Sequence, residues 1–364
     1  MSSANASAPG HLRRSPAQEG SAREVQIRDG SGLRGVHHVR SDRSLTLRDY
    51  LFDVLPLTRW DGELIVVLQD RPFSVSVPPS TDDALGKAGL LLACGLGPRA
   101  QLVRRSDLDG SGLRRLMGQA LPEGTPRTAI DLLLLRGDLL LVSSFAAHRA
   151  SNGSADRDGP DDRNDRADPP GESPESCPSP GLLRNLAHSF NTRYVPVFPL
   201  PDVVPLERVG LQARVGPGER VGPQGRGRAV LGARRVESPG GDVGSIGLLD
   251  SPTRIAAAVR ATRTDLDPRL SYDPDLRGGI SRLAEVLGSL TDRHPAAALA
   301  GIRGTGRLKT QVTEAVVQAL RPLQLRYRQL EADPAPVHER LAEGSRAARE
   351  LIGGTLAAVR TATT

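Results

Sequence analysis

The last third of the chain carries a helical repeat of apolar residues that constrains its fold more than any other feature. Apolar side chains recur at helical spacing over residues 312–330 and again over residues 337–359, as on one face of an amphipathic helix. The intervening Asp333-Pro334 favours a turn. Pro322 lies inside the first run and has no backbone N–H, so we expect it to kink or end a helix near Leu320.

Two further helices are predicted upstream, at Pro252–Arg263 and at Ser281–Leu290. Asp250 or Ser251 is expected to be the N-cap of the first. Four or five amphipathic helices joined by short loops form an α-helical bundle. We therefore assign residues 251–364 to a C-terminal helical domain, of a kind that periodicity alone does not specify further.

Short apolar runs alternate with helical patterns in the preceding part of the chain, residues 31–250. This alternation predicts an α/β fold whose core is a parallel sheet that binds a nucleotide. The predicted elements are strands at Leu64–Leu68, Gln101–Val103 and Tyr194–Phe198, helices at Thr81–Leu96 and Pro180–Asn191, and a buried helix or strand pair at Ile130–Leu135 and Leu139–Val142.

Three segments lack the apolar content of a packed structure. Residues 1–30 are predicted to form a disordered tail, residues 150–180 a disordered insert and residues 215–228 a loop rich in Gly and Pro. The insert has almost no apolar side chains, so it cannot bury enough surface to offset the entropy lost on ordering.

Composition excludes several classes of protein. The two cysteines are too few and too far apart for a disulfide framework or a zinc site, and Cys94 is predicted to be a buried thiol. The histidines, among them His37 and His38, have no ligand spacing, so we expect surface or packing roles and no metal site. The chain has no apolar stretch of transmembrane length and no secretory leader, which predicts a cytoplasmic protein without membrane contact. The net charge of +6 suits nucleic-acid binding, although 42 acidic residues are interspersed.

Three sequence elements follow one another in the C-terminal third. They read YDPDLRGGISRL at Tyr272–Leu283, RPLQLRYRQLEADP at Arg321–Pro334 and EGSRAARELIGGTLAAV at Glu343–Val359. In order and spacing they resemble the helical part of bacterial tryptophanyl-tRNA synthetases, which are class I enzymes.

The resemblance implies a Rossmann-type core followed by a helical bundle. It also implies ATP-dependent activation of tryptophan, with Mg²⁺, and transfer of the amino acid to tRNA-Trp. A homodimer is implied as well, but the family's interface region is shortened here to MGQALPEGTPRTA at Met117–Ala129.

The first ATP-binding motif of the family, [HT]-[IL]-G-N at a helix N-terminus, corresponds to Thr46-Leu47-Arg48-Asp49. Thr46 fits the pattern. Arg48 replaces the glycine and would fill the adenine site, and Asp49 replaces a neutral amide and would repel phosphate. The preceding P-T-G turn of the family is Ser41–Arg43 here.

The second motif, K-M-S-K-S, corresponds to residues 234–238, and its lysines stabilise the pyrophosphate leaving group in the family. Arg234 keeps a cation and Ser238 keeps the hydroxyl, so both are candidate catalytic residues. Glu237 reverses the charge of the second lysine. Such a reversal at ~4 Å is worth several kcal/mol at an effective dielectric near ~20.

The tryptophan pocket of the family matches at Asp131, whose carboxylate would accept the indole N–H. An alternative is that Asp131 is an N-cap or a salt-bridged helix residue, because a carboxylate in an apolar run needs a partner. The next motif of the family, G-[ED]-D-Q, is Ser143–Ala146 here and has lost most of its hydrogen-bonding groups.

Two hypotheses follow from these motifs. The chain is either a divergent tryptophan–tRNA ligase, catalytically impaired because its ATP motifs are degraded, or a non-catalytic pseudo-synthetase that binds tRNA, tryptophan or another protein.

Overall fold

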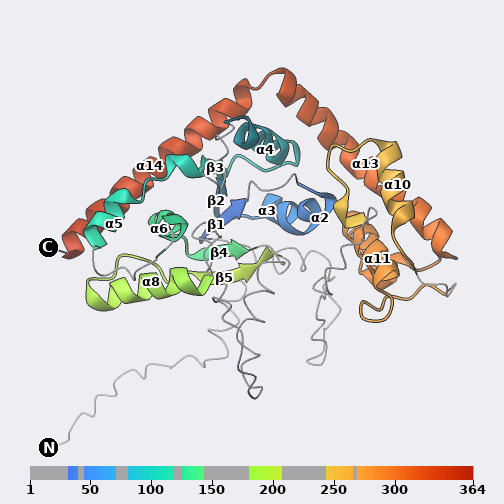
Figure 1. Cartoon of the computed structure of the whole chain (residues 1–364), viewed down its shortest axis with the longest axis horizontal. Helices are drawn as coiled ribbons and strands as arrows, with labels where there is room; N and C mark the ends of the chain where they lie inside the picture. Colours follow the sequence, from blue (N-terminus) through green and yellow to red (C-terminus); the bar gives the residue numbers. More distant parts are fainter. Residues whose placement is uncertain are drawn as a thin grey trace, which may run out of the picture.

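A five-stranded parallel sheet forms the centre of the computed structural model (Figure 1). The structure describes residues 32–39, 45–70, 81–117, 125, 127–142, 180–206, 243–264 and 269–363. The strand order is β3-β2-β1-β4-β5, the order of a Rossmann-type sheet, so the predicted fold class is confirmed. The strands are β1 (Arg34–Val39), β2 (Glu63–Leu68), β3 (Ala100–Arg104), β4 (Leu139–Val142) and β5 (Asp202–Pro205).

Helices cover both faces of this sheet and continue beyond it into the bundle. They are α2 (Leu47–Asp49), the π-helical η1 (Tyr50–Val54), α3 (Leu55–Thr58), α4 (Thr81–Ala93), the short η2 (Arg105–Asp107), α5 (Ser111–Met117), α6 (Arg127–Leu134), α8 (Pro180–Arg193), the short η5 (Val243–Ser245), α10 (Pro252–Ala261), α11 (Gly278–Thr291), α12 (Pro295–Ala298), α13 (Thr305–Ala332) and α14 (Ala335–Thr363). Pro180 begins α8, so the predicted insert extends one residue too far; its remainder, the tail and the loop at 215–228 lie outside the described residues.

The side chains of β2 alternate between two hydrophobic clusters. Leu64, Val66 and Leu68 pack with α3, α4 and α13 on one face, whereas Ile65 and Val67 pack with α5, α6 and α8 on the other. Because both faces are covered, the strands consist of nearly continuous apolar runs, as buried parallel strands do.

Two of the predictions about strands were incomplete or wrong. The central strand β1 was not anticipated, because His37 and His38 interrupt its apolar pattern. Tyr194–Phe198 is irregular, and the last strand of the sheet lies later, at β5. Asn191 explains the irregular path, since its side chain accepts from the N–H groups of Val197 (3.0 Å) and Phe198 (3.2 Å) and donates to Phe198 O (2.6 Å).

The expected end of a helix at Pro322 was also wrong. Helix α13 continues through Pro322 to Ala332. Leu320 and Leu323, on either side of the proline, are fully buried, so packing holds the helical path although one backbone donor is missing. The predicted turn at Asp333-Pro334 does separate α13 from α14.

Helix α14 leaves the bundle and runs along the sheet (Figure 1). Its first part contributes Val337 and Leu341 to the cluster on one face, and its later part contributes Ala348 and Ile352 to the cluster on the other. The helix therefore crosses the edge strand β3 and joins the predicted helical domain to the core.

Gly344 marks the point of crossing. A Cβ atom placed there would lie 2.1 Å from Leu102 O of β3, so only glycine allows this approach. One turn earlier, the Arg340 guanidinium donates to Gly97 O (3.0 Å) and Ala100 O (2.6 Å). These bonds hold α14 against the loop before β3 and the first residue of that strand.

We expect Gly344→Ala to destabilise the protein by about 3 kcal/mol, because the new methyl group must push α14 away from β3. Gly353→Ala on the same helix is the matched control, since no atom lies within 4 Å of its added Cβ, and it should be neutral or stabilise by about 0.5–1 kcal/mol. Urea unfolding of both variants measures the difference. Equal stability of the two variants would contradict the close crossing.

Candidate functional site

Two chain segments far apart in sequence meet at the start of α2. Leu47 N donates to Ile246 O (2.7 Å) and Leu248 N to Leu45 O (3.4 Å), and Thr46 forms an antiparallel bridge with Gly247. The first predicted ATP motif therefore lies against the segment that follows the second.

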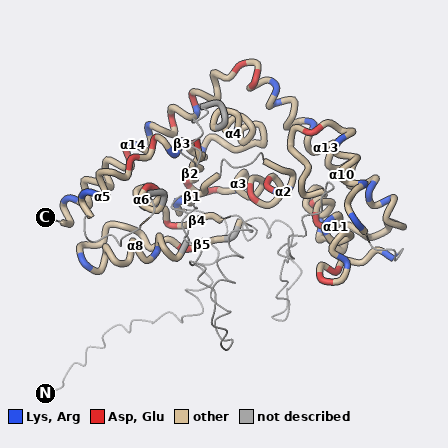
Figure 2. The backbone as a smooth tube through the Cα atoms, in the orientation of Figure 1, with Lys and Arg blue, Asp and Glu red and all other residues tan. Residues whose placement is uncertain are grey.

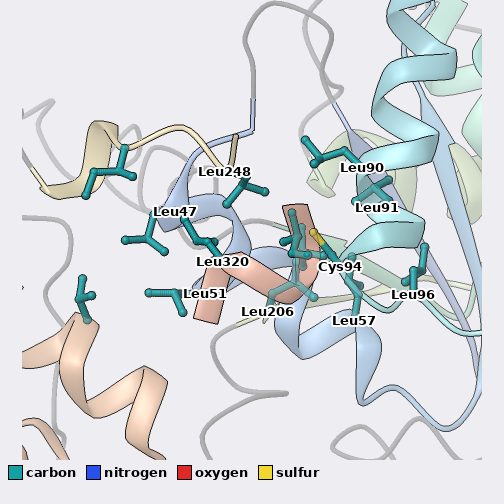
Figure 3. Close-up of a cluster of buried hydrophobic side chains, with 14 of the residues drawn as sticks. Leu47, Leu51, Leu57, Leu90, Leu91, Cys94, Leu96, Leu206, Leu248 and Leu320 are labelled. Carbon is teal, nitrogen blue, oxygen red and sulfur yellow. The ribbon is translucent and has the colours of Figure 1, made fainter. Parts of the chain in front are cut away.

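Helix α13 also holds this arrangement. The Gln324 side-chain amide donates to Leu248 O and Asp250 O, both at 3.0 Å. Leu47, Leu248 and Leu320, from three separate segments, lie together in one buried cluster (Figure 3). The candidate residues Arg234 and Ser238, with Glu237 between them, lie outside the described residues.

Thr46 and Asp49 form a capping box at the start of α2. Asp49 Oδ2 accepts from Thr46 N and from Thr46 Oγ1, both at 2.8 Å, and Asp49 N donates to Thr46 Oγ1 at 3.3 Å. The Asp49 side chain is buried. The N–H groups of Thr46 and Asp49 are thus satisfied within the box, and a carboxylate lies at the helix start.

Arg48, between these two residues, is half-buried and makes contacts within the protein. Its predicted position in an adenine site stays a prediction. The motif residues Ser41–Arg43 and Ser143–Ala146 lie outside the described residues.

Asp131 lies on α6 with its side chain almost fully buried, at 2% exposure. Its Oδ1 accepts from Gly110 N (3.1 Å) at the start of α5, and its Oδ2 lies 3.9 Å from Arg105 Nε. The contact with Arg105 agrees with the salt-bridged alternative. Asp131 lies inside α6, which begins at Arg127, so it is not the N-cap of that helix. The tryptophan contact stays a prediction.

No sequence pattern placed His37 and His38 at the ligand-binding edge of a sheet. Both are buried on β1 at its carboxyl end, where open α/β sheets bind ligands. His38 Nε2 lies 3.1 Å from Gln69 Oε1, and His37 Nδ1 lies 2.9 Å from Leu141 O. They have packing roles, one of the two roles expected.

Two features are absent from the described part of the chain. It contains no group of three His, Cys, Asp or Glu side chains that could hold a metal ion. No helix within it combines the length and the apolar content needed to cross a bilayer. Cys94 is buried as predicted, and burial raises the pKa of its thiol to about 12.

No family model matches the chain. Among curated proteins it is similar to tryptophan–tRNA ligase 1 of Streptomyces coelicolor, with 33% identity over 175 residues, or 48% of each chain. It is also similar to the tryptophan–tRNA ligase of Caulobacter vibrioides, with 34% identity over 190 residues, covering 49% of this chain and 50% of the relative. The chain spans about half the length of the curated relatives it matches.

Solved structures show the same fold over most of the chain. Tryptophanyl-tRNA synthetase from Mycoplasma pneumoniae superposes with a TM-score of 0.61 at 17% identity, covering 89% of this chain and 96% of its own. The Campylobacter jejuni synthetase complexed with ADP and tryptophan gives a TM-score of 0.55 at 14% identity, covering 90% and 98%.

We expect His37 to lower the free energy of unfolding as the pH falls. Burial lowers the pKa of His37 below its ordinary value of 6.5, against a smaller opposing effect of the hydrogen bond with Leu141 O. The unfolded chain then binds the proton more readily, so this contribution is present above the ordinary pKa and is lost as the pH falls below it. Between pH ~7.5 and ~5.5 the wild type should lose about 1 kcal/mol more than His37→Asn, in which the amide can keep the bond without titrating. Urea unfolding at both pH values measures this, and identical losses would contradict it.

Proposed function

We propose that this chain, a divergent relative of the bacterial tryptophanyl-tRNA synthetases, is a non-catalytic homologue that binds tRNA without forming tryptophanyl adenylate. The sequence relatives and the fold support the kinship. The activity of a whole synthetase does not carry over with it, because only about half of each curated relative is matched.

The Thr46–Asp49 capping box is the observation that carries the proposal. Adenylate formation depends on amide donors and positive charge placed on the triphosphate. At the start of α2 the N–H groups of Thr46 and Asp49 bond within the box and Leu47 N donates to Ile246 O, and the box places the negative Asp49 carboxylate there. These residues do not fit a triphosphate, so no step through ATP or its Mg²⁺ is assigned to them.

The second motif supports the same conclusion from sequence. Glu237 puts a negative charge between Arg234 and the Ser238 hydroxyl, where the related enzymes need positive charge on the leaving group. Ser143–Ala146 retains only serine hydroxyls for the substrate amine and ribose. All three losses act on the activation step.

Arginines gather at one end of the helical bundle, which supports retained RNA binding. Over the described residues 251–314, Figure 2 shows cationic positions on α10, α11 and α13. Exposed acidic side chains in that range are Asp275, Asp292 and Glu314. The exposed arginines are Arg254, Arg260, Arg263, Arg269, Arg293, Arg303 and Arg307. Such a cationic surface favours the phosphate backbone of a nucleic acid.

We expect no tryptophan-dependent exchange of pyrophosphate into ATP by the purified protein. Arg48, Asp49 and Glu237 each remove an interaction that the activation step needs. The assay runs beside a curated tryptophan–tRNA ligase as the positive control. Exchange at even about a hundredth of the control rate, a barrier difference of only ~2.7 kcal/mol, would refute the proposal.

We expect the protein to bind tRNA with a strong dependence on salt. Arg260→Gln combined with Arg307→Gln should weaken binding and reduce the slope of log K against log [salt] by about 2. The end of α10 contacts the first turns of α13, since Lys309 donates to Arg260 O (2.9 Å). The control is Arg193→Gln with Arg346→Gln, which removes two exposed arginines from α8 and α14. If both double variants weaken binding equally, the bundle end is not the binding surface.

A further inference from the structure

A groove lies between α10 and the chain segment that precedes this helix. Its volume is about 280 Å³. The segment lines it with Ile246 and Asp250, and the helix lines it with Arg254, Ala257, Ala258 and Ala261. The helical residues recur at a spacing of three or four, so they share one face of α10. Three of them are alanines, whose short side chains leave this space unfilled.

Hydrogen bonds hold both walls of the groove. Val243 N donates to Thr262 Oγ1 (3.2 Å), which ties the start of the segment to the end of α10. Two side chains of α13 hold the same walls from their other ends. Lys309 Nζ donates to Thr262 O (2.8 Å), and the Gln324 amide donates to Asp250 O (3.0 Å). The groove is therefore preformed, and a ligand that enters it does not have to order the chain.

The size and the lining of the groove suit one nucleotide base. A volume of about 280 Å³ is close to the lower limit of ordinary ligand pockets, ~300–1,000 Å³, so it favours a small flat ligand. The alanine methyl groups offer an apolar surface to the face of a base. Asp250 lies at the rim, where its Oδ1 is 3.3 Å from Arg254 Nε and its Oδ2 accepts from Gly247 N (2.9 Å). A carboxylate accepts more than two hydrogen bonds, and it can take one from the amino group of a base.

The groove belongs to a helix that carries part of the arginine surface described above. The Arg254 side chain is 77% exposed, and Arg260, next to Ala261, is also exposed. Arginines that hold phosphates of an RNA here bring its bases close to the groove. Only an unpaired base can leave its stack and enter such a site.

We propose that this groove binds one unpaired base of an RNA, and that Asp250 favours a base with an exocyclic amino group, such as cytosine. The inference rests on the proposed function, in which exposed arginines bind the RNA backbone. It adds that the RNA presents a single-stranded segment to α10. Duplex RNA keeps its bases stacked, so it binds the arginines without using the groove.

Ala257→Leu combined with Ala261→Leu tests this by filling the groove. Both alanines are exposed, and leucine is a strong helix former, so the variant should fold. The matched control is Ala357→Leu, which enlarges an exposed alanine on α14. The probes are a cytidine homopolymer, a uridine homopolymer of equal length and a duplex RNA, each titrated by fluorescence anisotropy.

The wild type should bind the cytidine polymer about fivefold more tightly than the uridine polymer. Filling the groove should weaken binding of the cytidine polymer about tenfold, the size of a lost base contact, and leave the affinity for duplex RNA unchanged. The slope of log K against log [salt] should not change, because no charge is removed. The control variant should bind all three RNAs as the wild type does.

Two results would overturn the inference. One is a folded groove-filling variant that binds the cytidine polymer as tightly as the wild type. The other is a wild type with equal affinity for the two polymers. If the double variant does not fold, Ala261→Leu alone is titrated in the same way and decides. A wild type that binds none of the three RNAs refutes the proposed function itself, so the two failures are distinguishable.

Discussion

The contact of α14 with the backbone of β3 at Gly344 determines how the parts of this protein are joined. With it, one helix packs into the hydrophobic clusters on both faces and covers an edge strand that would otherwise present unpaired backbone groups. Beside this contact, Ser345 of α14 donates to Asp107 and so ties η2, at the carboxyl end of β3, to the helix.

A second joint connects the bundle to the start of α2. Gln324 holds the carbonyls of Leu248 and Asp250, and the segment they belong to pairs with Leu45–Leu47. Elements from the beginning, the middle and the end of the chain therefore share one cluster of leucines (Figure 3). The first predicted ATP motif is held in this way against the segment that follows the second.

The sequence predicted the elements that have either a helical repeat of apolar residues over many turns or an uninterrupted apolar run. Helices α13 and α14 and strand β2 are of this kind. Strand β1 was not predicted because His37 and His38 are polar residues. Each has a hydrogen-bond partner only when β2 and β4 lie beside β1. Helix α13 passes Pro322 because Leu320 and Leu323 are buried by other elements. In each case a tertiary contact, which one-dimensional patterns do not contain, outweighed a local preference.

Thr46 and Asp49 were located correctly at a helix start, but the sequence could not show that the two side chains bind each other rather than facing outward. That orientation gives Asp49 a structural role. Its carboxylate completes a capping box with Thr46 and lies favourably at the positive end of the helix dipole; a cap is worth about 0.5–2 kcal/mol relative to alanine, and such a charge about 0.3–1 kcal/mol. The Asp49 carboxylate therefore stabilises the helix start at which it lies.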